Sequence, residues 1–186
     1  MELPTPSQTV GPFFNIGLPS EGRSELLAPD ADGAIRIEGI VSDGEGTPVN
    51  DALVEIWQAN RAGRYAHPED SRGDLPVEEG FRGFGRCETD ASGRYAFVTA
   101  KPGRVPAPDG RLQAPHADVS VFARGLLKRV VTRIYFPDER AANQADAVLS
   151  TVEPARRETL IAREDDGALR FDIRLQGDGE TVFFDL

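Results

Sequence analysis

Cysteine and long hydrophobic runs are almost absent from this sequence. Cys87 is the only cysteine, which excludes an internal disulfide and a zinc site built from cysteines. A single thiol in an acidic chain favours a reducing, cytoplasmic setting, and such a residue is more often buried in a strand than catalytic. No apolar run reaches the ~18 residues of a membrane helix. The stretch MELPTPSQTVGPFF lacks the basic and apolar regions of a secretory signal, so none is expected.

Positive charge is also scarce. The chain has 21 Lys and Arg against 31 Asp and Glu, a formal net charge of -10. This balance argues against a nucleic-acid-binding protein, because phosphate contacts need a basic face. It does not argue against a small anionic substrate, which needs only a local basic pocket. The sequence contains no nucleotide-binding glycine loop and no Gly-x-Ser-x-Gly elbow.

Glycine and proline, in contrast, are abundant. Nineteen glycines and fourteen prolines among 186 residues suit short strands joined by many turns. Alternating apolar residues and β-formers predict strands, and Trp57 within one of them is expected in the core. Outside the stretch Gln113–Phe136, these strands are predicted at 34–43, 52–59, 84–89, 95–99, 169–175 and 181–186.

These strands predict an all-β protein, an antiparallel β-sandwich with long loops and little helix. The turn at 90–93 predicts a hairpin between the strands at 84–89 and 95–99. Glu139–Ala147 is the best helical candidate, whereas 158–163 fits either helix or strand. No internal repeat and no second domain is evident.

We expect two parts, an extended arm at 1–33 and the β-sandwich domain at 34–186. Prolines forbid regular helix through most of the arm, yet its apolar residues are too many for a disordered tail. Two interpretations stay open: the arm packs on its own domain, or it crosses onto a partner chain.

The stretch Gln113–Phe136 predicts two strands joined by a short loop. His116 and Asp118 are two residues apart, so they point to one face of the first strand and form half of a metal site. Arg133 lies among apolar residues on the second strand. Tyr65 and His67 follow an earlier turn at strand spacing and complete the set of candidates for chemistry.

Several motifs resemble those of the intradiol ring-cleaving dioxygenase family, in the same order over almost the whole chain. The arm motif TPSQTVGPFF, the ARG loop at 123–125 and the ending ETVFFDL resemble alpha-type subunits of two-chain members more than beta-type subunits. The other matching segments are IEGIVSDGEGTPVNDALVEIWQAN at 37–60, GRYAHP at 63–68, GFGRCETDASGRYAF at 83–97, PHADVSVFARG at 115–125 and TRIYFPDE at 132–139.

The resemblance implies where a metal would lie. Catalytic chains of the family bind Fe(3+) with two tyrosinates and two histidines, and the matching positions here are Tyr65, Val105, His116 and Asp118. Two of the four have changed type, and valine cannot bind a metal. The resemblance therefore implies a degenerate site in this chain, with the Fe(3+) in a homologous beta subunit.

Two interpretations of that site remain open. In the first, Tyr65 and His116 hydrogen-bond each other and Asp118, with no metal. In the second, the same three residues form a weaker metal site, since a carboxylate is also an iron ligand. His67 is expected at the surface, outside either arrangement.

The resemblance also implies a role in a partner's pocket. Arg133 and the arm residues Thr9, Gly11 and Pro12 match positions that line the beta subunit's substrate pocket. The substrates implied are protocatechuate and O2, and the alpha–beta protomers would assemble into larger oligomers. From the residues alone, Arg133 is equally compatible with a surface arginine on an amphipathic strand.

Two rival functions remain. One is a self-sufficient intradiol enzyme acting on catechol or hydroxyquinol, which the changes at Val105 and Asp118 disfavour. The other is a binding module of the transthyretin type, which the pattern at 39–57 also suits. That pattern covers only part of the chain and leaves the arm and the C-terminal half unexplained.

Overall fold

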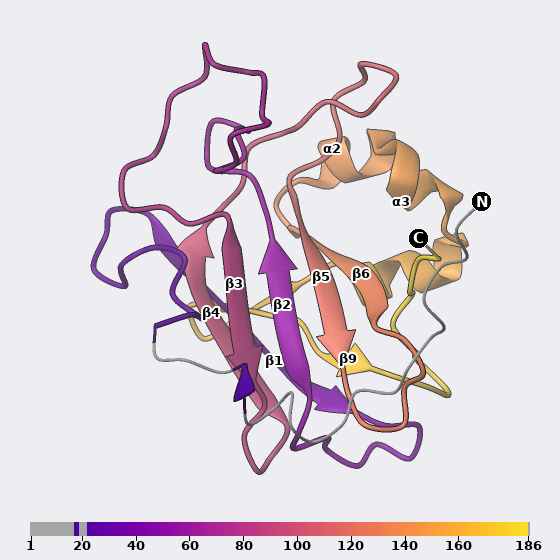
Figure 1. Cartoon of the computed structure of the whole chain (residues 1–186). Helices are drawn as coiled ribbons and strands as arrows, with labels where there is room; N and C mark the ends of the chain where they lie inside the picture. The colour runs from indigo at the N-terminus through magenta and orange to yellow at the C-terminus, as the bar shows by residue number, and fades with distance from the viewer. Residues whose placement is uncertain (1–16, 19–21, 186) are drawn as a thin grey trace, which may run out of the picture.

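The computed structural model describes residues 17–18 and 22–185 of the chain, and it is a β-sandwich. One sheet has the strand order β3-β2-β5-β6, and the other has the order β4-β1-β8-β7 with β9 also paired to β1. Figure 1 shows the first sheet in front of the second. The strands are β1 Ala34–Ser42, β2 Leu53–Trp57, β3 Phe84–Glu88, β4 Arg94–Ala100, β5 His116–Phe122, β6 Val130–Tyr135, β7 Arg163–Asp165, β8 Ala168–Arg170 and β9 Ile173–Arg174.

A helical region follows β6 in the chain. It comprises α2 Arg140–Ala145, α3 Ala147–Thr151 and a 3-10 helix at Pro154–Leu160. The helix predicted at 139–147 is therefore two short helices, divided at Asp146, whose side chain accepts a hydrogen bond from the backbone of Leu149 and caps α3. No helix among the described residues is long and apolar enough to span a membrane.

The core forms where the inward faces of the two sheets meet. Alternation along β5 turns Ala117, Val119 and Val121 inward, and all three are fully buried. Ile37 and Phe97 from the opposite sheet belong to the same apolar cluster. This alternation leaves the other face of β5 free for polar residues.

Two strand predictions were wrong. The residues at 84–89 and 95–99 are strands, but β3 pairs with β2 and β4 pairs with β1, so they belong to different sheets and form no hairpin. The turn between them closes locally, because the Asp90 N–H donates to the Arg94 carbonyl. Each strand nevertheless forms its ladder with a strand farther away in the sequence, β3 with β2 and β4 with β1. The predicted strand at 181–186 is, in its described residues, only an isolated bridge between Val131 and Phe184.

Other elements differ in extent. The strand predicted at 169–175 is interrupted between β8 and β9, where the Asp172 carboxylate accepts a hydrogen bond from the Ile40 backbone instead of continuing the ladder. Trp57, which was expected in the core, is only half-buried, because it faces outward from β2.

Part of the predicted arm is described. Leu26 and Leu27 are buried in the main core, and Glu25 bridges to Val98 on β4. Residues 22–33 therefore pack against their own chain. Most of the arm lies outside the described residues, so its crossing onto a partner stays a prediction.

Removing the ring of Phe97 tests the core. Its side chain is fully buried and lies 5.9 Å from the Tyr95 ring. Phe97→Ala should lower the free energy of unfolding by about 3–5 kcal/mol, measured by urea denaturation. Val77→Ala is the control, because Val77 is 73% exposed, and its change should stay within about 0.5 kcal/mol. A similar small change in Phe97→Ala would contradict the assigned core.

Candidate functional site

The candidate site lies on the outward face of the β3-β2-β5-β6 sheet. Strand register places Phe84, Trp57, Asp118 and Arg133 side by side in one row across this face. The row lies near the end of β2 and the start of β5, where the loops that follow β2 and precede β5 rise above the sheet (Figure 1). The side chains that the sequence singles out on β5 and β6 are therefore neighbours.

An ion pair joins the two strands in this row. The Arg133 Nε donates to Asp118 Oδ1 at 2.8 Å, and the Arg133 Nη1 donates to the Gln113 Oε1 at 2.8 Å. The side chains of Arg133 and Asp118 are 17% and 33% exposed, so the pair is shielded but still reachable from outside. Arg133 is thus more than a free surface arginine.

His116 is held in one tautomer. Its Nδ1 lies 2.7 Å from the Ala114 carbonyl oxygen, which can only accept, so Nδ1 carries the proton and Nε2 is left with its lone pair. That Nε2 lies 4.0 Å from Asp118 Oδ1. Burial, and then the positive charge of Arg133, lower the pKa of His116 below its ordinary value. The imidazole is therefore neutral at neutral pH.

Asp146 stabilises this arrangement through the Ala114 backbone. It is fully buried, and its carboxylate accepts from the Ala114 N–H at 2.8 Å and the Tyr135 hydroxyl at 3.0 Å, in addition to capping α3. Asp146 therefore fixes the backbone whose carbonyl orients His116. We did not identify this residue from the sequence, although an aspartate before Ala147–Thr151 is a recognisable helix-cap signal.

Tyr65 lies over the same row. Its ring stacks on Trp57 at 5.6 Å with an interplanar angle of 8°, and the Arg72 guanidinium lies 5.6 Å from its centre. Burial, and then the charge of Asp118, raise the pKa of Tyr65 above its ordinary value. The phenol therefore stays protonated at neutral pH. Outward-facing Trp57 and Arg72 therefore both pack against the ring.

The hydrogen bonds of the site differ from those expected. Among the described residues, no hydrogen bond joins Tyr65 to His116 or either of them to Asp118. Asp118 bonds to Arg133 instead, and His116 bonds to Ala114. The guanidinium of Arg133, on the adjacent strand β6, is therefore the hydrogen-bond partner of the Asp118 carboxylate.

The residues do not fit the family's ferric site. Val105 is 4% exposed and has no donor atom, and the Asp118 carboxylate is already bonded to a cation. The described part of the chain contains no group of three or more His, Cys, Asp or Glu able to hold a metal ion. A site with two tyrosinates and two histidines cannot form here.

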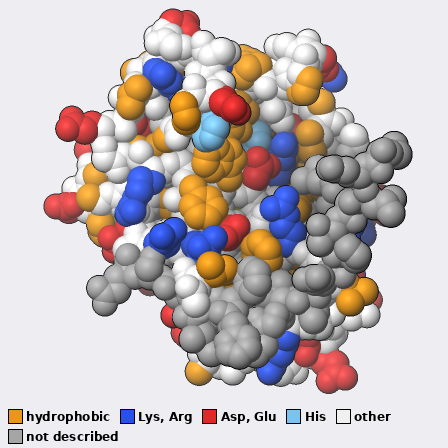
Figure 2. Space-filling view, in the orientation of Figure 1, with side chains coloured by type: hydrophobic (Ala, Val, Ile, Leu, Met, Phe, Trp, Pro, Cys, Tyr) orange, Lys and Arg blue, Asp and Glu red, His pale blue; other side chains and the backbone are white. Residues whose placement is uncertain are grey.

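The other residues that the sequence singles out lie outside this row or outside the described residues. His67 is exposed, lies edge-on to the Trp57 ring with centroids 6.0 Å apart, and accepts a hydrogen bond at Nδ1 from the Glu69 N–H at 3.2 Å. In the space-filling view, histidine side chains are visible on this face among acidic, basic and apolar side chains (Figure 2). Thr9, Gly11 and Pro12 lie outside the described residues.

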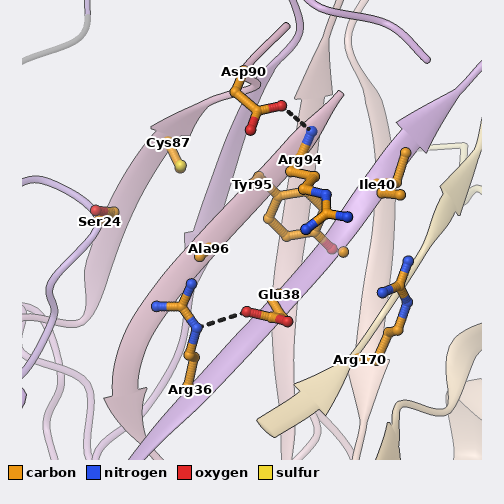
Figure 3. A pocket seen from close by; sticks show the side chains of 11 residues that line it. Ser24, Arg36, Glu38, Ile40, Cys87, Asp90, Arg94, Tyr95, Ala96 and Arg170 are labelled. Carbon is orange, nitrogen blue, oxygen red and sulfur yellow. Dashed lines mark hydrogen bonds and ion pairs between the residues drawn. The ribbon is translucent and has the colours of Figure 1, made fainter. Parts of the chain in front are cut away.

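A separate hollow lies beside β1, β4 and the end of β3. It has a volume of about 340 Å³, and Arg36, Glu38 and Cys87 are among the side chains around it (Figure 3). Arg36 is paired with Glu38 at 2.6 Å. Burial raises the pKa of the Cys87 thiol, which makes it a poor nucleophile. The thiol is therefore not a catalytic candidate in this hollow.

Titration of His116 gives a test of the site. Because its pKa is lowered in the folded state, the unfolded chain binds more protons below about pH 6.5, and stability is lost as the pH falls from there. His116→Asn should reduce the loss of unfolding free energy between pH 7 and pH 5, measured by urea denaturation. His67→Asn, which changes the exposed histidine, is the control and should keep the wild-type loss. An unchanged loss in His116→Asn would contradict a buried neutral imidazole.

Comparison with known proteins places this geometry in a family. A family model described as "Dioxygenase" matches residues 11–177. The protocatechuate 3,4-dioxygenase alpha chain of Burkholderia cepacia is 45% identical over 98% of this chain and 97% of its own length. The beta chain from the same organism is 40% identical over 79% of this chain and 66% of its own length.

A solved structure is also similar. The dioxygenase domain of a dioxygenase and carbohydrate-binding fusion protein from Streptomyces sp. SirexAA-E superposes with a TM-score of 0.60 at 25% identity. The match covers 83% of this chain and 88% of that one. Sequence and fold thus lead to the same family.

Proposed function

This chain belongs to the intradiol ring-cleaving dioxygenase family, and from that premise we propose that it is the alpha subunit of a protocatechuate 3,4-dioxygenase. The complex would insert both atoms of O2 into protocatechuate and break the ring between the two hydroxyl-bearing carbons. The product would be 3-carboxy-cis,cis-muconate. The observation that carries the proposal is 45% identity to an alpha chain over nearly the full length of both proteins.

Members of this family use non-haem iron. In the proposed enzyme the Fe(3+) belongs to a homologous beta subunit, where it would supply the redox chemistry of ring cleavage. Two observations support this assignment: the residues of this chain do not fit the ferric site, and a beta chain is itself a relative, at 40% identity. The proposed partnership is an alpha–beta protomer within a larger oligomer.

Within that complex, we assign Arg133 to recognition of the substrate carboxylate. A guanidinium presents a planar array of donors that matches a carboxylate, and it stays charged at any pH of interest. Arg133 lies on the outward face of its sheet with 17% of its side chain exposed, and Asp118 and Gln113 hold it there. A guanidinium held in this way is oriented before the substrate arrives.

The arm is assigned to the wall of the same pocket. Thr9, Gly11 and Pro12 would lie against the aromatic ring, since glycine allows close backbone approach and proline keeps the segment rigid. The support for this assignment is the motif TPSQTVGPFF, which this chain shares with alpha-type subunits.

The rival functions have weaker support. A self-sufficient catechol or hydroxyquinol enzyme needs a complete metal site, which Val105 and the Arg133–Asp118 ion pair do not provide. A transthyretin-type binding module would account for 39–57 alone, whereas the family model matches 11–177.

Activity of the separated subunits tests the proposal. The full-length chain alone should show no cleavage of protocatechuate, and mixing it with the beta subunit should produce activity together with all of the iron on the beta side. Oxygen uptake and metal analysis measure the two quantities. Turnover by this chain alone, with bound iron, would overturn the assignment.

Substitution of Arg133 tests its assigned role in the complex. Loss of a charge-assisted hydrogen bond of about 1.5–3 kcal/mol predicts that Arg133→Ala raises the KM for protocatechuate by about 10- to 100-fold. The KM for catechol, which has no carboxylate, should change far less. Arg163→Ala, on the opposite sheet, is the matched control for loss of one positive charge. Equal effects on the two substrates would show that Arg133 is structural.

A further inference from the structure

Three potential metal donors remain close together on the outward face of β2 and β5. His116 presents the lone pair of Nε2, and Asp118 Oδ1 lies 4.0 Å from it. That separation is too long for a hydrogen bond. It is compatible with both donors binding the same metal ion, each at about 2.1 Å. Tyr65 stacks on Trp57, the cross-strand neighbour of Asp118, and so supplies a phenol beside the same space.

These three donors face a permanent positive charge. The Arg133 Nε donates at 2.8 Å to Asp118 Oδ1, the same oxygen that lies 4.0 Å from the His116 Nε2. Register fixes this position, because Arg133 is the direct antiparallel partner of Asp118. A guanidinium does not lose its proton in a protein, so the charge persists at every relevant pH.

We propose that the guanidinium of Arg133 takes the place of the metal ion as the cation of this site, and that its charge keeps metal ions out of the chain. Loss of a ligand at Val105 alone would weaken metal binding but would still leave three donors. A second cation within several ångströms of a half-buried guanidinium is repelled, and the best remaining anionic ligand, Asp118, is already neutralised. The proposal concerns this chain's own residues and does not depend on the partner subunit.

The other charges around the site do not offset this repulsion. Asp70 forms its own ion pair with Arg72, whose guanidinium adds a second positive charge near Tyr65. Asp146 is committed to the Ala114 N–H, the Tyr135 hydroxyl and α3. Asp118, Asp70 and Asp146 are thus all bonded to other groups and do not balance the charge of an incoming ion.

Two substitutions at one position separate charge from geometry. Arg133→Gln removes the charge and keeps a polar side chain, whereas Arg133→Lys keeps the charge and loses the planar fork. The full-length chain and both variants are freed of metal with a chelator. Each is then incubated with Co2+, and separately with Fe3+ supplied as its nitrilotriacetate complex. Bound metal is measured after gel filtration, and the tyrosinate-to-iron absorption band reports Tyr65 as a ligand.

We expect Arg133→Gln to bind metal about 10- to 100-fold more tightly than the unchanged chain, since one unit charge has been removed at short range. Arg133→Lys should bind as weakly as the unchanged chain. Adding Tyr65→Phe to Arg133→Gln should abolish the absorption band. Arg163→Gln, which removes a charge on the other sheet, controls for net charge and should have no effect.

Three outcomes would overturn the proposal. If neither substitution increases metal binding, the missing ligand alone explains the degenerate site. If both increase it equally, geometry and not charge excludes the ion. If the unchanged chain already binds stoichiometric metal, no exclusion exists. Thermal melting monitors folding, and Arg133→Met replaces Arg133→Gln as the neutral variant if the latter melts below the assay temperature.

Discussion

β5 and β6 pair so that Ala117 lies opposite Ile134 and Asp118 lies opposite Arg133. Because side chains alternate along a strand, this single register assigns the first pair to the sandwich core and the second pair to the outward face. A slip by one residue would expose the apolar set and bury an ion pair in the core. The energy of the core therefore fixes the geometry of the site.

The outward face holds His116 and Asp118 close together, as a metal site would, but pairs the carboxylate with a protein cation. Asp146 fixes the Ala114 backbone, and the Ala114 carbonyl holds His116 through Nδ1, which leaves the Nε2 lone pair unprotonated. The positive charge bonded to Asp118 comes from Arg133 on the next strand. A buried histidine and a half-buried carboxylate can both be tolerated there, because one stays neutral and the other is paired.

This arrangement fits a subunit that supports catalysis in another chain. Such a subunit has no need of an iron of its own, but it needs a rigid surface from which to present Arg133. The ion pair with Asp118 meets both requirements, since it fills the site with a protein cation and fixes the direction of the guanidinium. The change of one ligand to aspartate would then be a functional replacement as well as a loss.

Local pattern was sufficient for most strands and for the choice of a sandwich. It did not predict which strands pair when the partners are far apart in the sequence. The turn at 90–93 looks like a hairpin turn, yet β3 and β4 each find a longer ladder elsewhere. Alternation at 169–175 predicts one strand, but the ladder with β1 is interrupted at Asp172, whose side-chain carboxylate accepts from the Ile40 N–H. Trp57 is apolar and ends β2, but strand parity directs it outward to Tyr65.

The identity of the residues at four positions was available from the sequence alone. A valine at 105 and an aspartate at 118 already indicate that the ferric site is incomplete, because side-chain chemistry decides what can bind a metal. Tertiary structure decided what replaced it. The bond from Arg133 to Asp118, and the support of His116 by Asp146, join segments 15 and 32 residues apart. Such contacts depend on strand register and loop packing, which no local pattern of residues specifies.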